Sequence, residues 1–192
     1  IHCGVNVDKF TFKRKDETDG VQLGMVLGDM WWPKNHMSGL DIFAQLYKKD
    51  PRWKLHIRGQ HEGGNDYWRV MYEHYLKSRG IENAVTLYPQ VEDMNEWYEK
   101  IDILLHPGMK EAFCYAIGEA MAKGIPTIIN EFMGSRDLWP EDLLYQTNDE
   151  AVKIIEMMGI VGKPPFERPR LHIRDTYSIE RMLNKYDEYL GT

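Results

Sequence analysis

The stretch Glu111-Ala-Phe-Cys-Tyr-Ala-Ile-Gly-Glu119-Ala-Met-Ala-Lys-Gly-Ile-Pro126 carries the strongest structural signal in this chain. It follows an apolar run that ends in His106-Pro107-Gly108, and it contains a helix-like segment closed by Lys123-Gly124. Its two carboxylates stand eight residues apart, the first in a loop and the second inside the helix. An open α/β sheet presents groups in this way at the carboxyl edge of its strands, where such folds bind nucleotides.

The composition is that of one large globular domain or of half of a two-domain protein. Of 192 residues, 43% are hydrophobic and 28% are charged, so a sizeable core is expected. The net charge of −6 argues against a general nucleic-acid binder. The sequence contains no apolar run of about 18 residues, so no transmembrane span is predicted. The chain begins at Ile1 and not at Met, so we interpret it as an excised piece of a longer protein.

The cysteines and histidines predict neither a disulfide framework nor a metal site. Cys3 and Cys114 lie far apart, which favours a reducing, cytoplasmic compartment. The seven histidines follow no ligand spacing with cysteines or acidic residues, so we expect no bound metal.

Strand-like and helix-like runs alternate along most of the chain. Strands are predicted at 22–28, 53–59, 85–88, 101–105, 125–129 and 143–145, and helices at 40–47, 67–77, 93–98, 114–122 and 148–158, the last capped by Asn148-Asp149-Glu150. Such alternation implies parallel pairing with right-handed crossovers. The predicted fold is an α/β, Rossmann-like, doubly wound, mostly parallel sheet.

Three segments are expected along the chain. Residues 1–20 form an interdomain link, residues 21–162 form the sheet domain, and residues 163–192 form a proline-rich link and a final helix. The prolines between Lys163 and Arg170 are expected to exclude a regular helix there, because they lack the amide proton. An amphipathic helix from about Thr176 to Leu190 is expected to pack on something that this chain lacks.

The turn from Leu105 into the helix at Cys114 is the best candidate anion site, because helix N-termini present free amide protons. Gly108 and Gly118 would allow backbone or ligand to approach closely. Glu119 would accept hydrogen bonds from ribose hydroxyls, and Glu111 from a sugar hydroxyl. The alternative is that Glu111 only complements the helix dipole and that Glu119 is a solvated helix residue.

Other segments carry weaker signals. Lys34 follows the first strand and Arg58 ends the second, so either side chain would meet a phosphate at the same edge, or be merely solvated. The loop Gly59-Gln-His-Glu-Gly-Gly64 would bind a ligand or form a plain turn, and its His61-Glu62 pair would serve as acid and base or stay exposed. The pair Trp31-Trp32 suggests an interface or a ligand contact.

Together these motifs resemble the carboxyl-terminal, donor-binding domain of retaining GT-B glycosyltransferases of family 4 (group 1). That group includes glycogen synthases and many bacterial mannosyl- and glucosyltransferases. The resemblance covers nearly the whole chain and lies in Ile1–Phe10, in Val85–Val91 followed by Asp93-Met94 and Tyr98, in Asp102–Pro107, in the paired Glu111 and Glu119 with the run up to Pro126, and in Asn130–Asp137.

The resemblance implies a nucleoside diphosphate sugar as donor substrate and no other cofactor. By it, Glu119 holds the ribose and Glu111 contacts hydroxyls of the donor sugar. Backbone amides of Ala112, Phe113 and Cys114 would meet sugar or phosphate oxygens, and backbone from Tyr88 to Gln90 would meet the base. No metal is implied, since amides, a helix dipole and basic side chains stabilise the leaving diphosphate.

The sequence departs from that family in two places. The family pattern "G-R-x-x-x-x-K-G" has an arginine and a lysine after the first strand, and we expect Asp29 and Ser38 at or near those positions, with Lys34 or Arg58 as the substitute catalytic cation. Losing one such donor commonly costs roughly 3 kcal/mol of transition-state stabilisation. Cys114 replaces the usual glycine, although its amide stays usable.

The expected partners follow from the same resemblance. An amino-terminal domain, absent from this chain, would hold a carbohydrate or lipid-linked acceptor and contact the final helix, and the isolated domain would transfer little or no sugar. Contact with the inner face of a membrane stays open. A non-catalytic nucleotide-sugar-binding or interaction domain is the main alternative, and a nucleotide-sugar epimerase is a weaker one.

Overall fold

A six-stranded, fully parallel sheet forms the centre of the protein. The computed structural model describes residues 2–10, 20–28, 32–59, 66–89, 93–161 and 166–191. The strands are β1 (Gln22–Val26), β2 (Lys54–Arg58), β3 (Val85–Tyr88), β4 (Ile103–His106), β5 (Thr127–Asn130) and β6 (Leu144–Tyr145), in the order β3-β2-β1-β4-β5-β6. The predicted fold class is therefore confirmed, and all six predicted strands are present.

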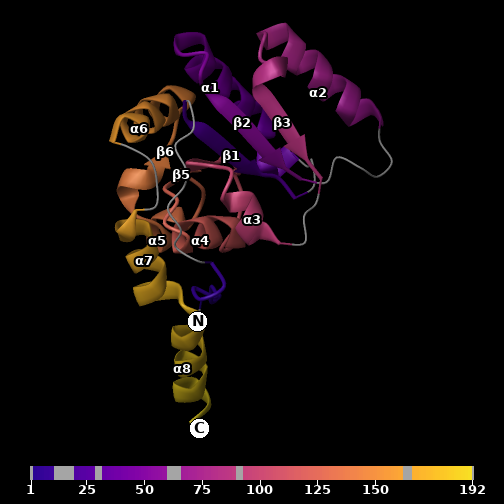
Figure 1. Ribbon diagram of the computed structural model, residues 1–192. Coiled ribbons are helices and arrows are strands. Elements are labelled where there is room, and N and C mark those ends of the chain that lie inside the picture. The colour runs from indigo at the N-terminus through magenta and orange to yellow at the C-terminus, as the bar shows by residue number, and fades with distance from the viewer. Residues whose placement is uncertain are drawn as a thin grey trace.

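Helices cover both faces of the sheet (Figure 1). They are α1 (His36–Lys49), α2 (Asp66–Arg79), α3 (Met94–Tyr98), α4 (Tyr115–Ala122), α5 (Ser135–Leu138), α6 (Asn148–Val161), α7 (Glu167–Tyr177) and α8 (Ile179–Leu190), with single turns η1 (Trp32–Lys34), η2 (Glu82–Ala84) and η3 (Glu141–Leu143). In Figure 1, α1, α2 and α6 lie above the sheet, and α3, α4, α5 and α7 lie below it. This is the doubly wound arrangement.

The direction of winding reverses between β1 and β4. The chain passes from β1 outward through β2 to β3, then returns to β4 on the other side of β1 and continues to β5 and β6. Ligands of open α/β sheets bind in the crevice at such a switch point, beyond the carboxyl ends of the two strands. The loops after β1 and β4 meet there, and the second of them contains Glu111.

The core is apolar on both sides of the sheet. All four residues of β4 are buried, as expected for a central parallel strand. Fully buried side chains also come from α1 and α4, including Phe43 and Ile117. Gly24 on β1 lies under α3. A Cβ at this position would come within 3.0 Å of the Trp97 ring, so a larger residue would not fit.

Helix α6 starts one residue earlier than its predicted cap implies. Asn148 is the first helical residue, and Thr147 is the cap, with its hydroxyl accepting a hydrogen bond from the Glu150 amide (3.2 Å). The Glu150 carboxylate in turn accepts from the amides of Gln146 and Thr147. This reciprocal capping satisfies amide donors that would otherwise lack partners.

The carboxyl-terminal segment differs from the prediction in two respects. Helix α7 already begins at Glu167 and contains Pro169, so the proline-rich run does not exclude a helix up to Arg170. Pro169 is the third helical residue, where the missing amide proton would have had no intrahelical partner. The expected single final helix is broken at Ser178, whose extended backbone pairs with Val5 and whose hydroxyl caps α8.

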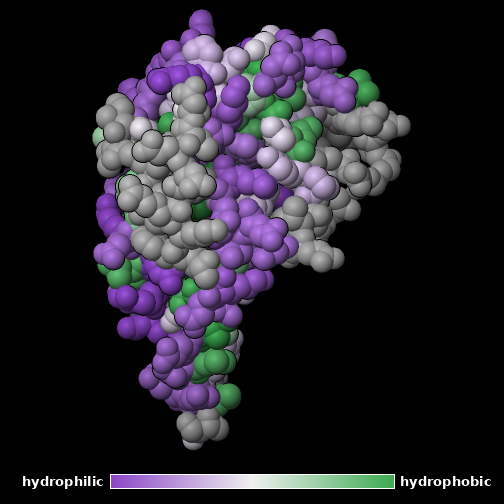
Figure 2. Space-filling view, in the orientation of Figure 1, coloured by the Kyte–Doolittle hydropathy of each residue, from purple (hydrophilic) through white to green (hydrophobic). Residues whose placement is uncertain are grey.

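The two halves of this segment are packed very differently. Helix α7 buries Ile173 and Tyr177 against the domain, whereas α8 buries no residue and projects away from it next to the amino terminus (Figure 1). Figure 2 shows hydrophobic side chains along α8, where Leu183 and Tyr189 are exposed. The division of the chain at residues 20 and 162 stays a prediction.

Candidate functional site

The loop between β4 and α4 forms one wall of the candidate site. It leaves the sheet at the buried His106 and enters α4 through Cys114, whose φ of 59° lies in the left-handed region. That conformation favours glycine, so a cysteine there carries backbone strain. Its energetic cost is about 1–2 kcal/mol relative to an ordinary backbone.

Hydrogen bonds tie this loop to the segment after β1. The Met109 amide donates to the Pro33 carbonyl (2.8 Å), and Asn130 donates from its side chain to the Gly108 carbonyl (3.2 Å). As a result Lys34 reaches the acidic loop, and its ammonium nitrogen lies 2.6 Å from Glu111 Oε1. The structure thus brings the candidate residues Lys34 and Glu111 together at this edge of the sheet as an ion pair.

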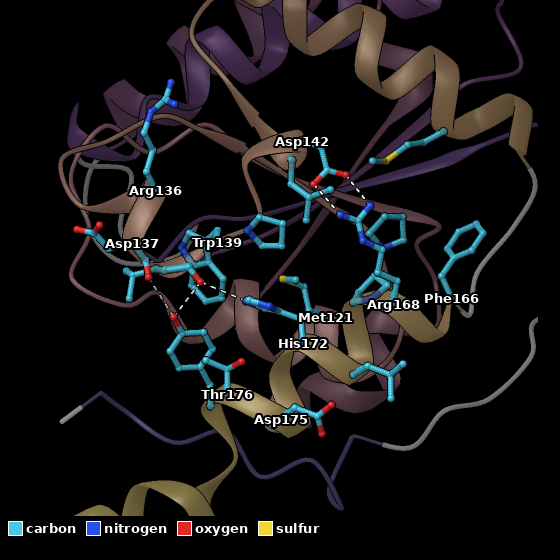
Figure 3. A pocket seen from close by; sticks show the side chains of 18 residues that line it. Met121, Arg136, Asp137, Trp139, Asp142, Phe166, Arg168, His172, Asp175 and Thr176 are labelled. Atoms are coloured by element: carbon cyan, nitrogen blue, oxygen red, sulfur yellow. Dashed lines mark hydrogen bonds and ion pairs between the residues drawn. The ribbon is translucent and has the colours of Figure 1, made fainter.

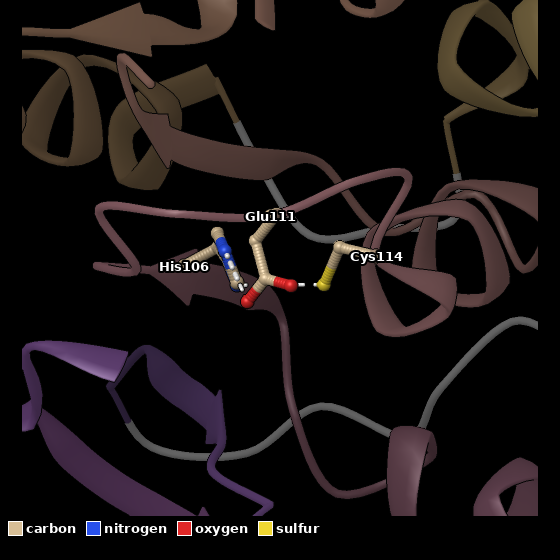
Figure 4. A group of neighbouring side chains, drawn as sticks. All are labelled: His106, Glu111 and Cys114. Carbon is tan, nitrogen blue, oxygen red and sulfur yellow. Dashed lines mark hydrogen bonds and ion pairs between the residues drawn. The ribbon is translucent and has the colours of Figure 1, made fainter. Parts of the chain in front are cut away.

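His106 and Cys114 complete the surroundings of Glu111 (Figure 4). His106 Nε2 lies 3.5 Å from Glu111 Oε1, and His106 Nδ1 lies 3.7 Å from Cys114 Sγ. Burial, and secondly the charge of Lys34, lower the pKa of His106 to about 3. Burial, and secondly the charge of Glu111, raise the pKa of Cys114 to about 12. Both side chains are therefore uncharged at neutral pH.

His106, Glu111 and Cys114 meet in the folded chain, although their spacing in the sequence follows no metal-ligand pattern. One donor atom each from His106, Glu111 and Cys114 lies within 4.8 Å of the others, a spacing that a metal ion could use. The Lys34 ammonium already contacts the Glu111 carboxylate, and the Cys114 thiol holds its proton. Both facts disfavour a cation, and the absence of a metal requirement stays a prediction.

Gly108 allows this close packing. A Cβ at Gly108 would lie 2.7 Å from His106 Nε2 and 3.2 Å from Glu111 Oε1, so a larger residue would displace one of them. Gly118 serves a different contact from the one expected, because a Cβ there would meet Val5 at 2.7 Å. Its small size admits the amino-terminal segment.

Glu119 lies one turn into α4 in a second polar environment. It is half-buried, and its Oε2 accepts a hydrogen bond from the hydroxyl of the fully buried Tyr98 (3.0 Å). Burial raises the pKa of Glu119, while the Tyr98 hydrogen bond and the charges of Lys9 and Arg58 oppose that rise. The alternative that Glu119 is a solvated helix residue is therefore wrong, and the charge of Arg58 acts on Glu119.

The backbone between the two glutamates is open to a ligand. In the described part of the chain, the amides of Ala112, Phe113 and Cys114 donate to no protein acceptor. The Phe113 ring is buried against Trp139 and Tyr177, which anchors the loop from below. Amides without partners at the start of a helix are typical of an anion site.

Of the remaining predicted contact residues, only some lie in the part of the chain that the structure describes. Tyr88 ends β3, where its hydroxyl hydrogen-bonds His56 Nδ1 (2.9 Å) and its carbonyl accepts from the Gly59 amide. The residues Asp29, Trp31, His61, Glu62 and Gln90 lie outside the described residues, as does most of the loop after Gly59.

The family assignment comes from comparison with known proteins. A family model described as glycosyl transferases group 1 matches residues 22–158, which include both glutamates, Lys34 and Tyr98. The chain belongs to this family. Its six-stranded sheet is the sheet of GT-B carboxyl-terminal domains.

Named relatives cover different parts of this group 1 glycosyltransferase chain. Protein CapJ of Staphylococcus aureus is 24% identical over 80% of the chain, which spans 38% of the length of CapJ. A GDP-mannose-dependent alpha-mannosyltransferase of Mycolicibacterium smegmatis is 46% identical over 41 residues, or 21% of the chain and 11% of that protein. The structure of Anabaena HepE with UDP and glucose has a TM-score of 0.79 at 16% identity, covering 98% of this chain and 55% of HepE.

The lysine of the family pattern has a counterpart in this chain. In "G-R-x-x-x-x-K-G" the lysine stands five residues after the arginine, so with Asp29 at the arginine position it falls on Lys34. Ser38 was therefore the wrong assignment. Its hydroxyl donates to Asn148 Oδ1 (2.7 Å) at the α1–α6 contact. Asn35 has a φ of 49°, which suits the glycine that ends the pattern.

Two neighbours of the glutamates, His106 and Tyr98, were not among the predicted site residues. His106 precedes Glu111 by five residues at the end of an apolar strand, a position from which its burial could have been inferred. Tyr98 belongs to a segment that carries the family resemblance, and no spacing rule links it to Glu119, 21 residues later.

A cavity of about 850 Å³ lies elsewhere, between α7 and the segment from α5 to η3 (Figure 3). Trp139, His172 and Tyr177 line it, and the Arg168–Asp142 ion pair crosses its rim. None of the predicted site residues lines this cavity. No helix in the described part of the chain has the length and apolarity needed to cross a bilayer.

Proposed function

We propose that this chain is the donor-binding domain of a retaining, family 4 glycosyltransferase that transfers a sugar from a nucleoside diphosphate sugar. The observation that carries the proposal is the arrangement at the switch point. Glu111 pairs with Lys34 there, next to amides that have no acceptor among the described residues, and Glu119 lies one helical turn beyond. A cation, open amides and two differently held carboxylates match the parts of a sugar nucleotide.

Each residue receives a role from its surroundings. Glu119 accepts hydrogen bonds from the ribose, and the α4 amides with Lys34 bind the diphosphate. Glu111 orients hydroxyls of the donor sugar. The structure of HepE with UDP and glucose, which shares the fold, supports a uridine or other nucleoside diphosphate at this edge.

The chemistry assigned to this domain is stabilisation of the leaving group. As the bond between the anomeric carbon and the phosphate oxygen breaks, the electron pair stays on the diphosphate. Preorganised amides, the N-terminus of α4 and the Lys34 ammonium favour that charge without a metal ion. The acceptor oxygen forms the new bond to the anomeric carbon, and its proton leaves to the diphosphate or to solvent.

The remainder of the protein would supply the acceptor. Because the chain spans 38% of CapJ and 55% of HepE, we propose that an amino-terminal domain holds a carbohydrate or lipid-linked acceptor. By itself this chain is expected to bind nucleotide and to transfer little or no sugar.

The second candidate function is nucleotide-sugar binding without catalysis. One observation favours it, since Asp29 stands where the family pattern has a second cation. Transfer assays with the complete protein separate the two functions. The non-catalytic domain binds the donor but shows no transfer across a broad acceptor panel.

Calorimetry with UDP, GDP, ADP and dTDP tests the donor site directly. We expect one nucleotide to bind selectively, and Glu119→Ala to weaken it by roughly 1–3 kcal/mol through loss of a charged hydrogen bond. Glu96→Ala, at an exposed glutamate of α3, is the matched control and should change nothing. No binding by any of the four would contradict a donor site in this chain.

A further inference from the structure

Tyr98 is held rigidly beneath the candidate ribose site. It is the last residue of α3, has no exposed surface, and packs edge-on against Trp97 with ring centroids 5.4 Å apart. The ring of Phe10 covers it from another side, at 6.0 Å. The short helix is anchored by Asp93, whose carboxylate accepts from the Asn95 amide. The phenol therefore has a fixed position.

The Tyr98 hydroxyl lies within reach of two acceptors on α4. Glu119 Oε2 is 3.0 Å away and the Ala116 carbonyl is 3.1 Å away. A phenol has one proton to donate, and an ionised carboxylate is the stronger acceptor. Glu119 Oε1, in contrast, has no protein partner in the part of the chain that the structure describes. One carboxylate oxygen is thus held and the other is left for a ligand.

We propose that Tyr98 is a positioning residue for nucleotide binding: its buried hydroxyl fixes one oxygen of Glu119 so that the other faces the ribose. This inference rests on the proposed donor-binding function. Glutamate side chains lose conformational freedom when they are ordered, and a partner that orders the carboxylate beforehand removes that cost from ligand binding.

At Glu119, an uncharged hydrogen-bond donor such as the Tyr98 hydroxyl is better suited to nucleotide binding than a cation would be. Burial, and secondly the charge of Glu119, raise the pKa of Tyr98 well above its ordinary value, so the phenol stays protonated. The hydrogen bond therefore orients Glu119 without cancelling its charge. At Glu111 the contact is with the Lys34 ammonium, which does balance the charge.

Other charged or titratable groups also face Glu119. Lys9 from the amino-terminal segment and Arg58 from β2 act on its charge, and Tyr115 on α4 senses it. These groups remain when the Tyr98 hydroxyl is removed. The expected result is a further rise in the pKa of Glu119, so that nucleotide binding is lost at a higher pH on acidification.

The test is Tyr98→Phe in this chain, which removes the hydroxyl and keeps the ring. Binding of UDP and GDP and of their 2′,3′-dideoxy counterparts would be measured by calorimetry between pH 5 and 8. For the nucleotide that binds, we expect roughly tenfold weaker affinity. The dideoxy counterpart should change less than twofold, and the acid limb of the pH profile should move to higher pH.

A matched control is Tyr72→Phe on α2. Tyr72 is buried, and its hydroxyl has no hydrogen-bond partner among the described residues. Its loss should leave both affinities and the pH profile unchanged. Equal weakening of ribose and dideoxy nucleotides by Tyr98→Phe would indicate a merely structural tyrosine and overturn the inference.

Glu119→Gln separates failure of the inference from failure of the proposed function. If this variant loses ribonucleotide affinity while Tyr98→Phe does not, the positioning role is wrong and the donor site stands. If neither variant changes nucleotide binding, or if no nucleotide binds the unaltered chain, both proposals are overturned.

Discussion

Glu111 and Glu119 lie eight residues apart in the chain but in two different electrostatic environments. Glu111 meets the Lys34 ammonium at 2.6 Å, beside a buried neutral histidine. Among the described residues, Glu119 meets a neutral phenol and no other group at hydrogen-bond distance, and burial raises its pKa. The same type of side chain therefore acts as part of an ion pair at one position and as a hydrogen-bond acceptor at the other, according to what the fold places beside it.

The two regions also differ in how they are built. Glu111 and its ion-pair partner Lys34 lie in segments that follow the neighbouring strands β4 and β1, and loops can adjust when a ligand enters. The hydrogen-bond partner of Glu119, Tyr98, comes from helix α3 and is fully enclosed. We expect the Glu111 region to rearrange on donor binding and the Glu119 region to stay as it is.

The largest expected effect concerns the neutral histidine beside Glu111. The folded-state pKa of His106, about 3, lies below its unfolded value of 6.5. Stability from the neutral imidazole is therefore fully present above pH 6.5 and is lost as the pH falls toward 3. Over about 3.5 units at about 1.4 kcal/mol each, the full loss is roughly 5 kcal/mol.

Replacing the histidine should remove this acid sensitivity. In urea titrations from pH 7 to pH 3, His106→Asn should show a shallower fall in the free energy of unfolding than the unaltered chain. His74→Asn, at an exposed residue of α2, is the control. If the free energy of unfolding falls equally with pH in all three proteins, the His106 imidazole is not kept neutral by the fold.

The next largest effect concerns the cation that distinguishes Glu111 from Glu119. Lys34→Met should lower the free energy of unfolding by about 1–3 kcal/mol, because it leaves a carboxylate with only 12% of its side chain exposed and no cation. Adding Glu111→Gln should restore most of the loss, as measured by a double-mutant cycle in urea. The exposed Lys49–Glu156 pair is the control, with an expected cost below about 1 kcal/mol for Lys49→Met.

A third prediction separates the ligand roles of the two glutamates. Glu119→Gln should weaken a nucleoside diphosphate and its sugar conjugate alike, by roughly tenfold. Glu111→Gln should reduce only the additional affinity of the sugar conjugate, by a few-fold. Competition calorimetry with both ligands measures the difference. If both variants lose the same affinity for each ligand, the two glutamates have the same ligand role.

The smallest effect concerns the turn that divides the two regions. At an ordinary φ, alanine is more stabilising than glycine, but Cys114 has a φ of 59°. We therefore expect Cys114→Gly to unfold at a higher temperature than Cys114→Ala, by about 1 kcal/mol of stability. The reverse order in calorimetric melting would mean that the left-handed turn is absent.

Local patterns along the chain were enough to predict the sheet. Apolar runs of strand length alternating with amphipathic helices predicted all six strands, and the run through His106, Glu111 and Glu119 located the candidate site. The break at Ser178 and the helix across Pro169 escaped, because both depend on contacts with distant elements. Ser178 pairs with Val5, and α7 packs on α4.

Residue types and spacing determined the fold class, the two glutamates and the basic residue after β1, because these signals are local and periodic. Only the tertiary structure decided the partners. Lys34 lies 77 residues from Glu111 in the chain, and Tyr98 lies 21 residues from Glu119. Parallel strands bring distant loops to one edge of the sheet, so the charge, burial and hydrogen bonding of each carboxylate arise only when the chain has folded.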